Sequence, residues 1–129
     1  MRSYQLFIIV TKEIELKVGK LGKFIFPIGS YVYTGSAKKN IDKRIERHLS
    51  KKKNLHWHID YLLNSDAVQI INIKKSQMTE CSLNKKTKGT IIINGFGSSD
   101  CNLCCKSHLK YKGNIALAKL SANAIGGYK

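Results

Sequence analysis

The segment GSYVYTGSAKKNIDKRIERHL, residues 29–49, changes its hydrophobic pattern halfway along. Residues 30–34 are aromatic and β-branched, which predicts a strand that ends at Gly35. From residue 37 to residue 49 there is no glycine or proline, and Ile41, Ile45 and Leu49 recur at every fourth position. That spacing predicts an amphipathic helix. The segment therefore indicates a domain that combines strands with helices.

The segments on either side fit the same picture. Residues 3–10 form a dense aromatic and β-branched run, which predicts a central strand that is buried on both faces. Residues 13–18 and 23–27 flank a glycine-containing turn, which predicts a hairpin, so the first 36 residues are predicted to form an antiparallel meander. Beyond the first helix we predict helices at 57–63 and between 76 and 88, and strands at 67–73 and 90–93.

The length of 129 residues is that of one domain. We predict an α/β (α+β) fold in which a small central sheet, mixed or antiparallel, is flanked by helices. Residues 1–113 are assigned to this domain, including a Cys- and His-rich loop at 95–109. Residues 114–129 are predicted to be a C-terminal helix or tail.

Charge is the unusual feature of the composition. The chain has 23 Lys and Arg residues against 8 Asp and Glu residues, for a net charge of +15. A field of that size attracts polyanions, so nucleic acid is the first expected partner and an anionic membrane surface the second. No apolar run is long enough to cross a membrane, and the N-terminus lacks the pattern of a signal peptide. We therefore expect a cytoplasmic protein without a membrane-spanning helix.

The predicted helix at 38–53 concentrates the positive charge. At 100° per residue, Arg44 lies about 60° and His48 about 20° from Ile41, at the edge of the apolar stripe, whereas Lys43 and Arg47 share the wetter face. The helix is either a solvated surface with His48 in the core, or a wall that faces phosphates. Its basic residues are Lys38, Lys39, Lys43, Arg44, Arg47, Lys51, Lys52 and Lys53.

An ordered set of short motifs adds a family resemblance. Tyr33-x-Gly35-Ser36 resembles the second half-motif of the GIY-YIG endonuclease superfamily, and Ser3-Tyr4-Gln5-Leu6 resembles the first. The chain is more specifically similar to the small Uri-type branch. That similarity covers residues 3 to 111 and is carried by residues 29–37, Arg44-x-x-Arg47-His48, residues 57–62, Glu80-Cys81, residues 95–101 and residues 107–109.

The resemblance implies a metal-dependent phosphodiesterase that acts on DNA. It implies an arginine, a glutamate and the motif tyrosines on one face of the sheet. Two departures are visible: Arg2-Ser3-Tyr4 stands where Gly-Ile-Tyr is usual, and Thr34 stands where isoleucine is usual.

The expected roles follow from the chemistry of phosphodiester hydrolysis. Glu80 would hold Mg²⁺ or Mn²⁺, and Arg44 would bind the scissile phosphate in bidentate fashion. Tyr4 and Tyr33 would position or deprotonate the attacking water, although a phenol is a weak base unless its site lowers its pKa. His48 would assist or merely pack. The simpler alternatives are a first-turn helix charge for Glu80 and core aromatics for the tyrosines.

Further residues are candidates for DNA contact. The lysines of the 38–53 helix and Arg47 are predicted to bind the backbone, together with His58. His58 and Asp60 offer an alternative as a second ligand pair, although Trp57 and its apolar neighbours in the same segment are typical of ordinary packing.

The loop at 95–109 carries its own chemistry. Its spacing would allow a structural Zn²⁺ bound by three of four candidates and a distant ligand such as Cys81. The alternative is a substrate-facing loop with buried thiols. The candidates are Cys101, Cys104, Cys105 and His108.

These observations predict a metal-dependent endonuclease that hydrolyses DNA, with DNA preferred over RNA and single-stranded or structured DNA among the expected substrates. Two alternatives remain. One is a nucleic-acid-binding module without catalysis, and the other is a small zinc-stabilised interaction protein. Both nucleic-acid functions predict salt-sensitive binding, and only the endonuclease predicts cleavage that a chelator abolishes.

Overall fold

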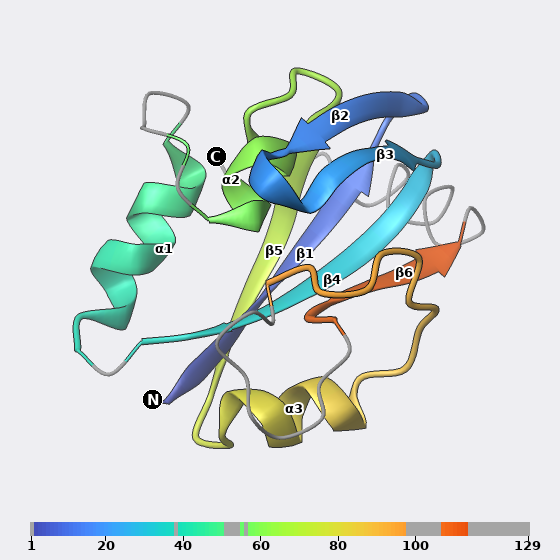
Figure 1. Cartoon of the computed structure of the whole chain (residues 1–129). Helices are drawn as coiled ribbons and strands as arrows, with labels where there is room; N and C mark the ends of the chain where they lie inside the picture. The colour runs from blue at the N-terminus through green and yellow to red at the C-terminus, as the bar shows by residue number, and fades with distance from the viewer. Residues whose placement is uncertain (1, 38, 51–54, 56, 98–106, 114–129) are drawn as a thin grey trace.

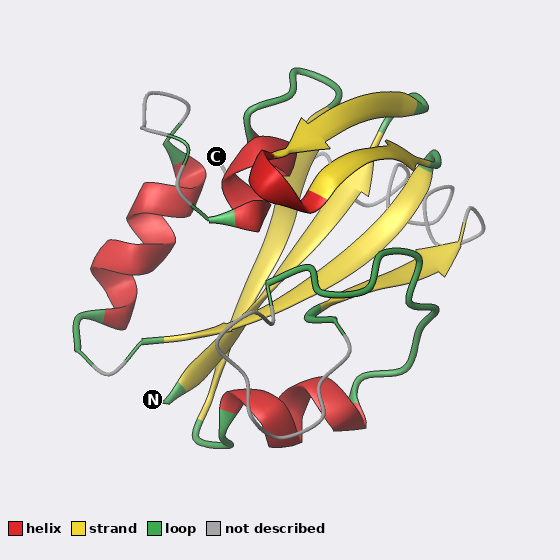
Figure 2. Cartoon of the chain, in the orientation of Figure 1, coloured by secondary structure: helices red, strands yellow, loops and turns green. Residues whose placement is uncertain are grey.

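The fold was obtained as a computed structural model that describes residues 2–37, 39–50, 55, 57–97 and 107–113. It is a mixed α+β fold, as predicted from the sequence, with a sheet that has helices at its side and at its end (Figures 1 and 2). In chain order the elements are β1 (Ser3–Val10), β2 (Ile14–Val18), a short 3-10 turn (Gly19–Leu21), β3 (Gly22–Phe26), β4 (Gly29–Ser36), α1 (Ile41–Leu49), α2 (His58–Leu63), β5 (Val68–Ser76), α3 (Glu80–Lys86) and β6 (Leu109–Gly113).

The main sheet has four strands in the order β5-β1-β4-β6, and every neighbouring pair is antiparallel. β1 is central, as predicted, because it pairs with β4 on one side and β5 on the other. In the β1–β4 register Tyr4 lies opposite Gly35, and Leu6 lies opposite Tyr33. Since side chains alternate along a strand, Tyr4 and Tyr33 project from the same face of the sheet.

The predicted hairpin is present, but the predicted meander is wrong. β2 and β3 pair with each other in a separate two-stranded sheet, so β1 pairs directly with β4 instead of with the hairpin between them. The alternation of apolar and polar residues in β2 and β3 indicates that one face of the hairpin is buried. It does not indicate which part of the protein covers that face. α2 contacts both β2 and β5, which places it between the hairpin and the main sheet.

The helices are shorter than the periodicity predicts. α1 begins at Ile41 because Asn40 adopts a left-handed backbone conformation with φ 52°. It ends at Leu49, since Ser50 is extended, and residues 51–53 lie outside the described part of the chain. α3 begins at Glu80 rather than directly after residue 76. The Thr79 hydroxyl caps its first turn by accepting a hydrogen bond from the Ser82 backbone N–H.

Two strand predictions need correction. The predicted strand at 90–93 is reduced to a single bridge, in which Thr90 and Tyr111 exchange backbone hydrogen bonds. Residues 109–113, for which no strand was predicted, form the edge strand β6. β6 owes its place to partners that are distant in sequence, because it pairs with β4 and the ring of Tyr111 packs on Tyr31 at 5.0 Å.

The core brings the sheet together with α2, the hairpin and the segment that precedes β6. α1 and α3 lie at the end of the sheet where β1 begins and where β4 and β5 end (Figure 1). This end of the sheet is where the predicted site residues meet. The largest fully buried side chains of the core are Tyr4, Leu6, Ile8, Val10, Val18, Phe26, Tyr31, Ile59, Leu62, Phe96, His108 and Leu109.

Candidate functional site

A pocket of about 170 Å³ opens at this end of the sheet. Four of the five residues predicted to be catalytic, those of β1, β4, α1 and α3, line it, although they are as far as 76 positions apart in the sequence. The fifth, His48, lies directly behind it against Tyr4. The pocket is lined by Tyr4, Tyr33, Ser36, Arg44, Trp57, Glu80, Gly97 and His108.

Tyr4 and His48 form a hydrogen-bonded pair. The Tyr4 hydroxyl lies 2.6 Å from His48 Nε2, and both residues are buried. α1 supplies His48 on the turn after Arg44, so one helix face delivers both residues, as its periodicity predicted. The His48 ring also packs against three aromatic rings at 5.5–6.1 Å, those of Tyr4, Tyr33 and Trp57. His48 is therefore both a packed core residue and the direct partner of the Tyr4 phenol.

Burial alters the acid–base chemistry of the two tyrosines. Desolvation raises the pKa of Tyr4 above its ordinary value, and the positive charge of Arg44 opposes this without cancelling it. Desolvation also raises the pKa of Tyr33 well above 10, with a contribution from Tyr4. The site thus fails to lower the phenol pKa, which a tyrosine acting as a base on its own would require. Both phenols are neutral at ordinary pH.

Arg44 is held by two contacts. Its Nη1 donates a hydrogen bond of 2.6 Å to the Ser36 carbonyl at the end of β4, and its guanidinium carbon lies 4.5 Å from the centre of the Trp57 ring. A guanidinium that stacks on an aromatic ring loses little rotamer freedom when it binds a further partner. Arg44 is thereby fixed at the pocket wall.

Arg47 stacks on the same ring at 4.2 Å and forms a bidentate ion pair with Asp60. Asp60 is fully buried and also accepts a hydrogen bond of 2.8 Å from the Trp57 backbone N–H, which fixes the start of α2. The predicted placement of Arg47 on the wet face is therefore wrong, because Asp60 draws its side chain inward to 29% exposure. Trp57, which the sequence suggested to be ordinary packing, links both arginines to the pocket.

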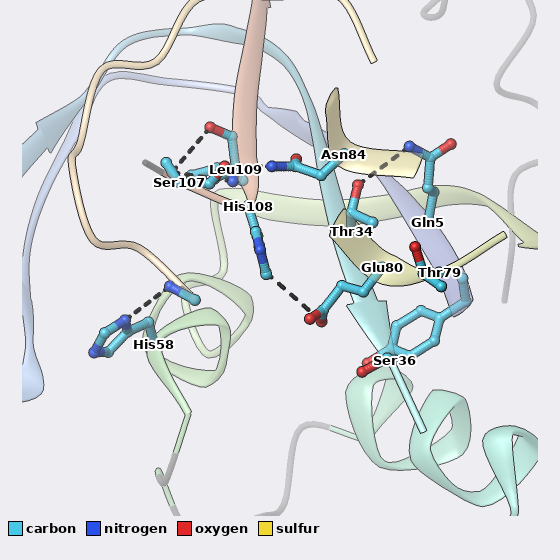
Figure 3. Close-up of polar contacts among 12 residues, drawn as sticks. Gln5, Thr34, Ser36, His58, Thr79, Glu80, Asn84, Ser107, His108 and Leu109 are labelled. Atoms are coloured by element: carbon cyan, nitrogen blue, oxygen red, sulfur yellow. Dashed lines mark hydrogen bonds and ion pairs between the residues drawn. The ribbon is translucent and has the colours of Figure 1, made fainter. Parts of the chain in front are cut away.

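Glu80 and His108 face each other across the pocket (Figure 3). Glu80 Oε2 lies 3.6 Å from His108 Nδ1, and the Glu80 side chain is 27% exposed whereas that of His108 is 1% exposed. Burial and the charge of Lys110 lower the pKa of His108, and the Gly97 backbone weakly opposes them. The imidazole is therefore neutral at ordinary pH, and one of its ring nitrogens has a lone pair that can bind a metal ion or accept a hydrogen bond.

The other predicted DNA contacts divide into two groups. Lys39 and Lys43 are exposed on the α1 side of the pocket, whereas Lys38 and the lysines at 51–53 lie outside the described residues. His58 accepts a hydrogen bond of 2.9 Å from the Gly97 backbone N–H, so it supports the loop at the pocket. His58 and Asp60 have different partners and do not form the alternative ligand pair.

The zinc prediction falls largely outside the described residues. Cys101, Cys104 and Cys105 belong to the segment 98–106, which is not described, and Cys81 lies half-buried on α3. In the described part of the chain, no group of three or more His, Cys, Asp or Glu side chains converges in a way that could hold a metal ion. His108, the fourth candidate, faces Glu80.

Sequence reasoning gave no catalytic or DNA-binding role to four lining residues, Trp57, His108, Gly97 and Ser36, although it named His108 as a zinc candidate. For Trp57 a signal existed in the two arginines of Arg44-x-x-Arg47, which share one helix face and therefore suit a common aromatic partner. The spacing of the Cys- and His-rich loop marked His108 only as a zinc candidate, because its place beside Glu80 depends on the pairing of the segment before β6 with Thr34 of β4.

No helix among the described residues is long and apolar enough to cross a membrane. No curated protein and no solved structure matches the chain. The sequence profile of one family, described as "Domain of unknown function DUF123", matches residues 3–127. The match spans nearly the whole length of the chain, which therefore belongs to the DUF123 family.

Proposed function

We propose that this protein is a metal-dependent endonuclease that hydrolyses DNA phosphodiester bonds in the pocket at the end of the sheet. The observation that carries the proposal is the convergence of a fixed guanidinium, a carboxylate and a Tyr–His pair on one pocket. These are an anion binder, a metal ligand and a proton acceptor, which are the three functions that phosphodiester hydrolysis requires. They are also the residues that carry the resemblance to the Uri-type GIY-YIG nucleases.

Arg44 would bind the scissile phosphate. Two nonbridging phosphate oxygens match the planar donor fork of a guanidinium, and the bond from Arg44 Nη1 to Ser36 leaves further N–H groups of the fork for them. Because Trp57 and Ser36 fix the side chain before substrate arrives, the charge that develops on the phosphoryl oxygens meets a positioned cation.

Tyr4 and His48 would act together on the attacking water. A neutral phenol cannot take a proton without losing its own, and His48 Nε2 at 2.6 Å is the group that can receive it. As the water oxygen bonds to phosphorus and the bond to the leaving oxygen breaks, the water proton passes to Tyr4 Oη and the phenol proton passes to His48. The leaving oxygen carries the negative charge, and His48 ends as an imidazolium. Tyr33 packs edge-on against His48 and holds the ring in place.

Glu80 fits the metal that the resemblance implies. It is a partly exposed carboxylate on the pocket wall, and Mg²⁺ or Mn²⁺ in phosphate chemistry binds through one or two carboxylates and keeps its other positions for water and phosphate. When bound, the ion stabilises the negative charge on the phosphoryl and leaving oxygens.

The surrounding charge suits a DNA partner. Lys39 and Lys43 lie next to and on the helix that supplies Arg44, and Lys85 and Lys86 lie on the helix that supplies Glu80; all four are exposed. With a net charge of +15, the protein would attract the DNA backbone from either side of the pocket. DNA as a partner accounts for the charge without an anionic membrane surface. We expect the protein to act in the cytoplasm.

Cleavage assays test the proposal. The purified protein is incubated with supercoiled and with single-stranded DNA in Mg²⁺, in Mn²⁺ or with a chelator, beside Glu80→Ala and Arg44→Ala proteins whose fold is checked by circular dichroism. Glu46→Ala, which removes an exposed carboxylate from α1, is the matched control. We expect metal-dependent cleavage that is lost in both pocket variants and kept in the control. Salt-sensitive binding without any cleavage would instead establish a DNA-binding module.

A further inference from the structure

The pocket holds a second buried group that the proposed mechanism does not use. The His108 side chain is 1% exposed, and neither ring nitrogen forms a well-aligned hydrogen bond with a described residue, although the Gly97 backbone lies near enough to raise its pKa. Buried polar groups are nearly always hydrogen-bonded, so a buried histidine without a well-formed hydrogen bond is an exception that points to an absent ligand. Its Nδ1 atom faces the one carboxylate of the pocket.

The distance between His108 and Glu80 suits a shared cation. An ion about 2.1 Å from each ligand atom can bridge atoms up to about 4.2 Å apart. Nδ1 and Oε2 are 3.6 Å apart, which is within that span but too long for a hydrogen bond. The two atoms are therefore spaced for a third atom between them.

The backbone around the two residues is fixed independently of any ligand. Asn84 of α3 donates a hydrogen bond of 2.8 Å to the Ser107 carbonyl, and Lys110 donates bonds of 3.0 Å to the Asn84 and Thr87 carbonyls. These bonds join α3, which carries Glu80, to the segment that carries His108. On the other side, the His108 backbone bonds to Thr34 and Phe96. Such preorganisation is what a metal site requires of its supporting residues.

We infer that His108 and Glu80 together form a mixed nitrogen and oxygen metal site that selects a first-row transition ion such as Mn²⁺ over Mg²⁺. Imidazole nitrogen is a ligand that transition metals accept readily, whereas Mg²⁺ favours oxygen ligands. This inference rests on the proposed function for the role of Glu80 and extends it by deciding which ion the site takes. The remaining coordination positions belong to water and to the phosphate of the substrate.

Pulsed EPR on the full chain with added Mn²⁺ tests the inference without an activity assay. A histidine ligand gives the bound Mn²⁺ a ¹⁴N modulation that oxygen ligands cannot give. We expect this modulation in the wild type, its loss in His108→Gln, and its persistence in His58→Gln, the matched histidine that bonds to Gly97 outside the metal site. We also expect His108→Gln to weaken Mn²⁺ binding by at least about tenfold while Mg²⁺ binding changes much less.

Two other results separate the inference from the proposed function. If the wild type binds Mn²⁺ without ¹⁴N modulation and Glu80→Gln abolishes that binding, the site uses oxygen ligands only; this overturns the inference and leaves the proposed function standing. If Glu80→Gln binds Mn²⁺ as tightly as the wild type, Glu80 holds no metal, and both fail. Because the modulation is recorded on the wild type itself, the test holds even if a His108 variant unfolds.

Discussion

Gly35 lies directly opposite Tyr4 on the neighbouring strand, and a Cβ atom placed on Gly35 would lie 2.5 Å from the Tyr4 hydroxyl oxygen and 2.6 Å from its ring carbon Cζ. Real Cβ atoms do not approach other atoms so closely. The glycine is required because the Tyr4 ring crosses over it to reach His48. The backbone itself does not require a glycine, since Gly35 is not among the glycines with positive φ. This explains why the Tyr33-x-Gly35 motif ends in glycine.

We therefore expect Gly35→Ala to displace the Tyr4 hydroxyl from His48 and to lower the free energy of unfolding by about 1–3 kcal/mol, a typical cost of overpacking. Urea denaturation of a double-mutant cycle measures this. In a Tyr4→Ala background the same glycine substitution should cost far less, because the atoms it would meet are gone. Equal costs in both backgrounds would contradict the contact.

The Asp60–Arg47 pair should matter more to stability than the pair between Asp42 and Lys75. Asp60 is fully buried and binds Arg47 twice, whereas the Asp42 side chain is 73% exposed. Removing one partner of a buried pair leaves the other uncompensated, so we expect Asp60→Ala to cost about 3 kcal/mol, the low end for a buried pair because Arg47 is partly exposed. Asp42→Ala should cost less than about 1 kcal/mol. Urea denaturation checks both, and similar costs would refute the ranking.

Alkaline pH should destabilise the protein through Tyr31. Burial, with a contribution from Tyr111, raises the pKa of Tyr31, whose hydroxyl donates a hydrogen bond of 2.6 Å to the Pro27 carbonyl. The unfolded chain loses this proton near pH 10 while the folded protein keeps it, so stability falls as the pH rises above 10. Between the two pKa values, one such tyrosine adds a slope of about 1.4 kcal/mol per pH unit.

Tyr31→Phe should flatten that dependence. The variant loses stability at neutral pH with its hydrogen bond, yet its stability should decline less steeply than that of the wild type above pH 10. Denaturation at several alkaline pH values, with absorbance at 295 nm to follow tyrosine ionisation, separates the two effects. Parallel curves for wild type and variant would show that Tyr31 ionises alike in both states.

Arg44 should not be replaceable by lysine. An ammonium group keeps the charge but loses the planar donor fork and the stacking on Trp57. We expect Arg44→Lys to slow single-turnover DNA cleavage by about 10-fold to 100-fold, equivalent to the loss of one charged hydrogen bond. Arg2→Lys, at an exposed arginine outside the pocket, is the control. Equal cleavage rates for the wild type, Arg44→Lys and Arg2→Lys would show that Arg44 does not bind the scissile phosphate.

The sequence was sufficient to predict the elements with strong local patterns. The strand at 3–10, the hairpin, the strand before Gly35 and the helix that contains Arg44 and His48 are all present. The two strands have dense aromatic and β-branched runs, and the hairpin and the helix have a clear hydrophobic period. The ends of these elements differ from the predicted ones where the backbone conformation of a single residue sets the boundary, as Asn40 does for the start of α1. β6 could not be predicted because its short alternation of Lys and Tyr is stabilised by pairing with β4, which is far away in the sequence.

The site was predictable in part for the same reason. Motif order selected Tyr4, Tyr33, Arg44 and Glu80, and the pocket joins them. The position of His108 beside Glu80 depends on tertiary packing, which leaves no local periodic signal, and the spacing of the two arginines suits an aromatic partner without identifying Trp57. The raised pKa values of the tyrosines also follow from burial, and the contact between Tyr4 and His48 emerges only from the fold.

The most direct test of the central claim compares DNA cleavage with DNA affinity in the same variants. Tyr4→Phe and Glu80→Gln are measured beside Tyr31→Phe and Glu46→Gln, which make the same chemical changes outside the pocket. We predict that Tyr4→Phe lowers the single-turnover rate about 100-fold to 10,000-fold and that Glu80→Gln reduces it to the level seen with chelator. In both variants the Kd for DNA stays within a few fold, and both controls cleave like the wild type. Undiminished cleavage in the two pocket variants, or a loss that merely follows a loss of DNA binding, would contradict the account.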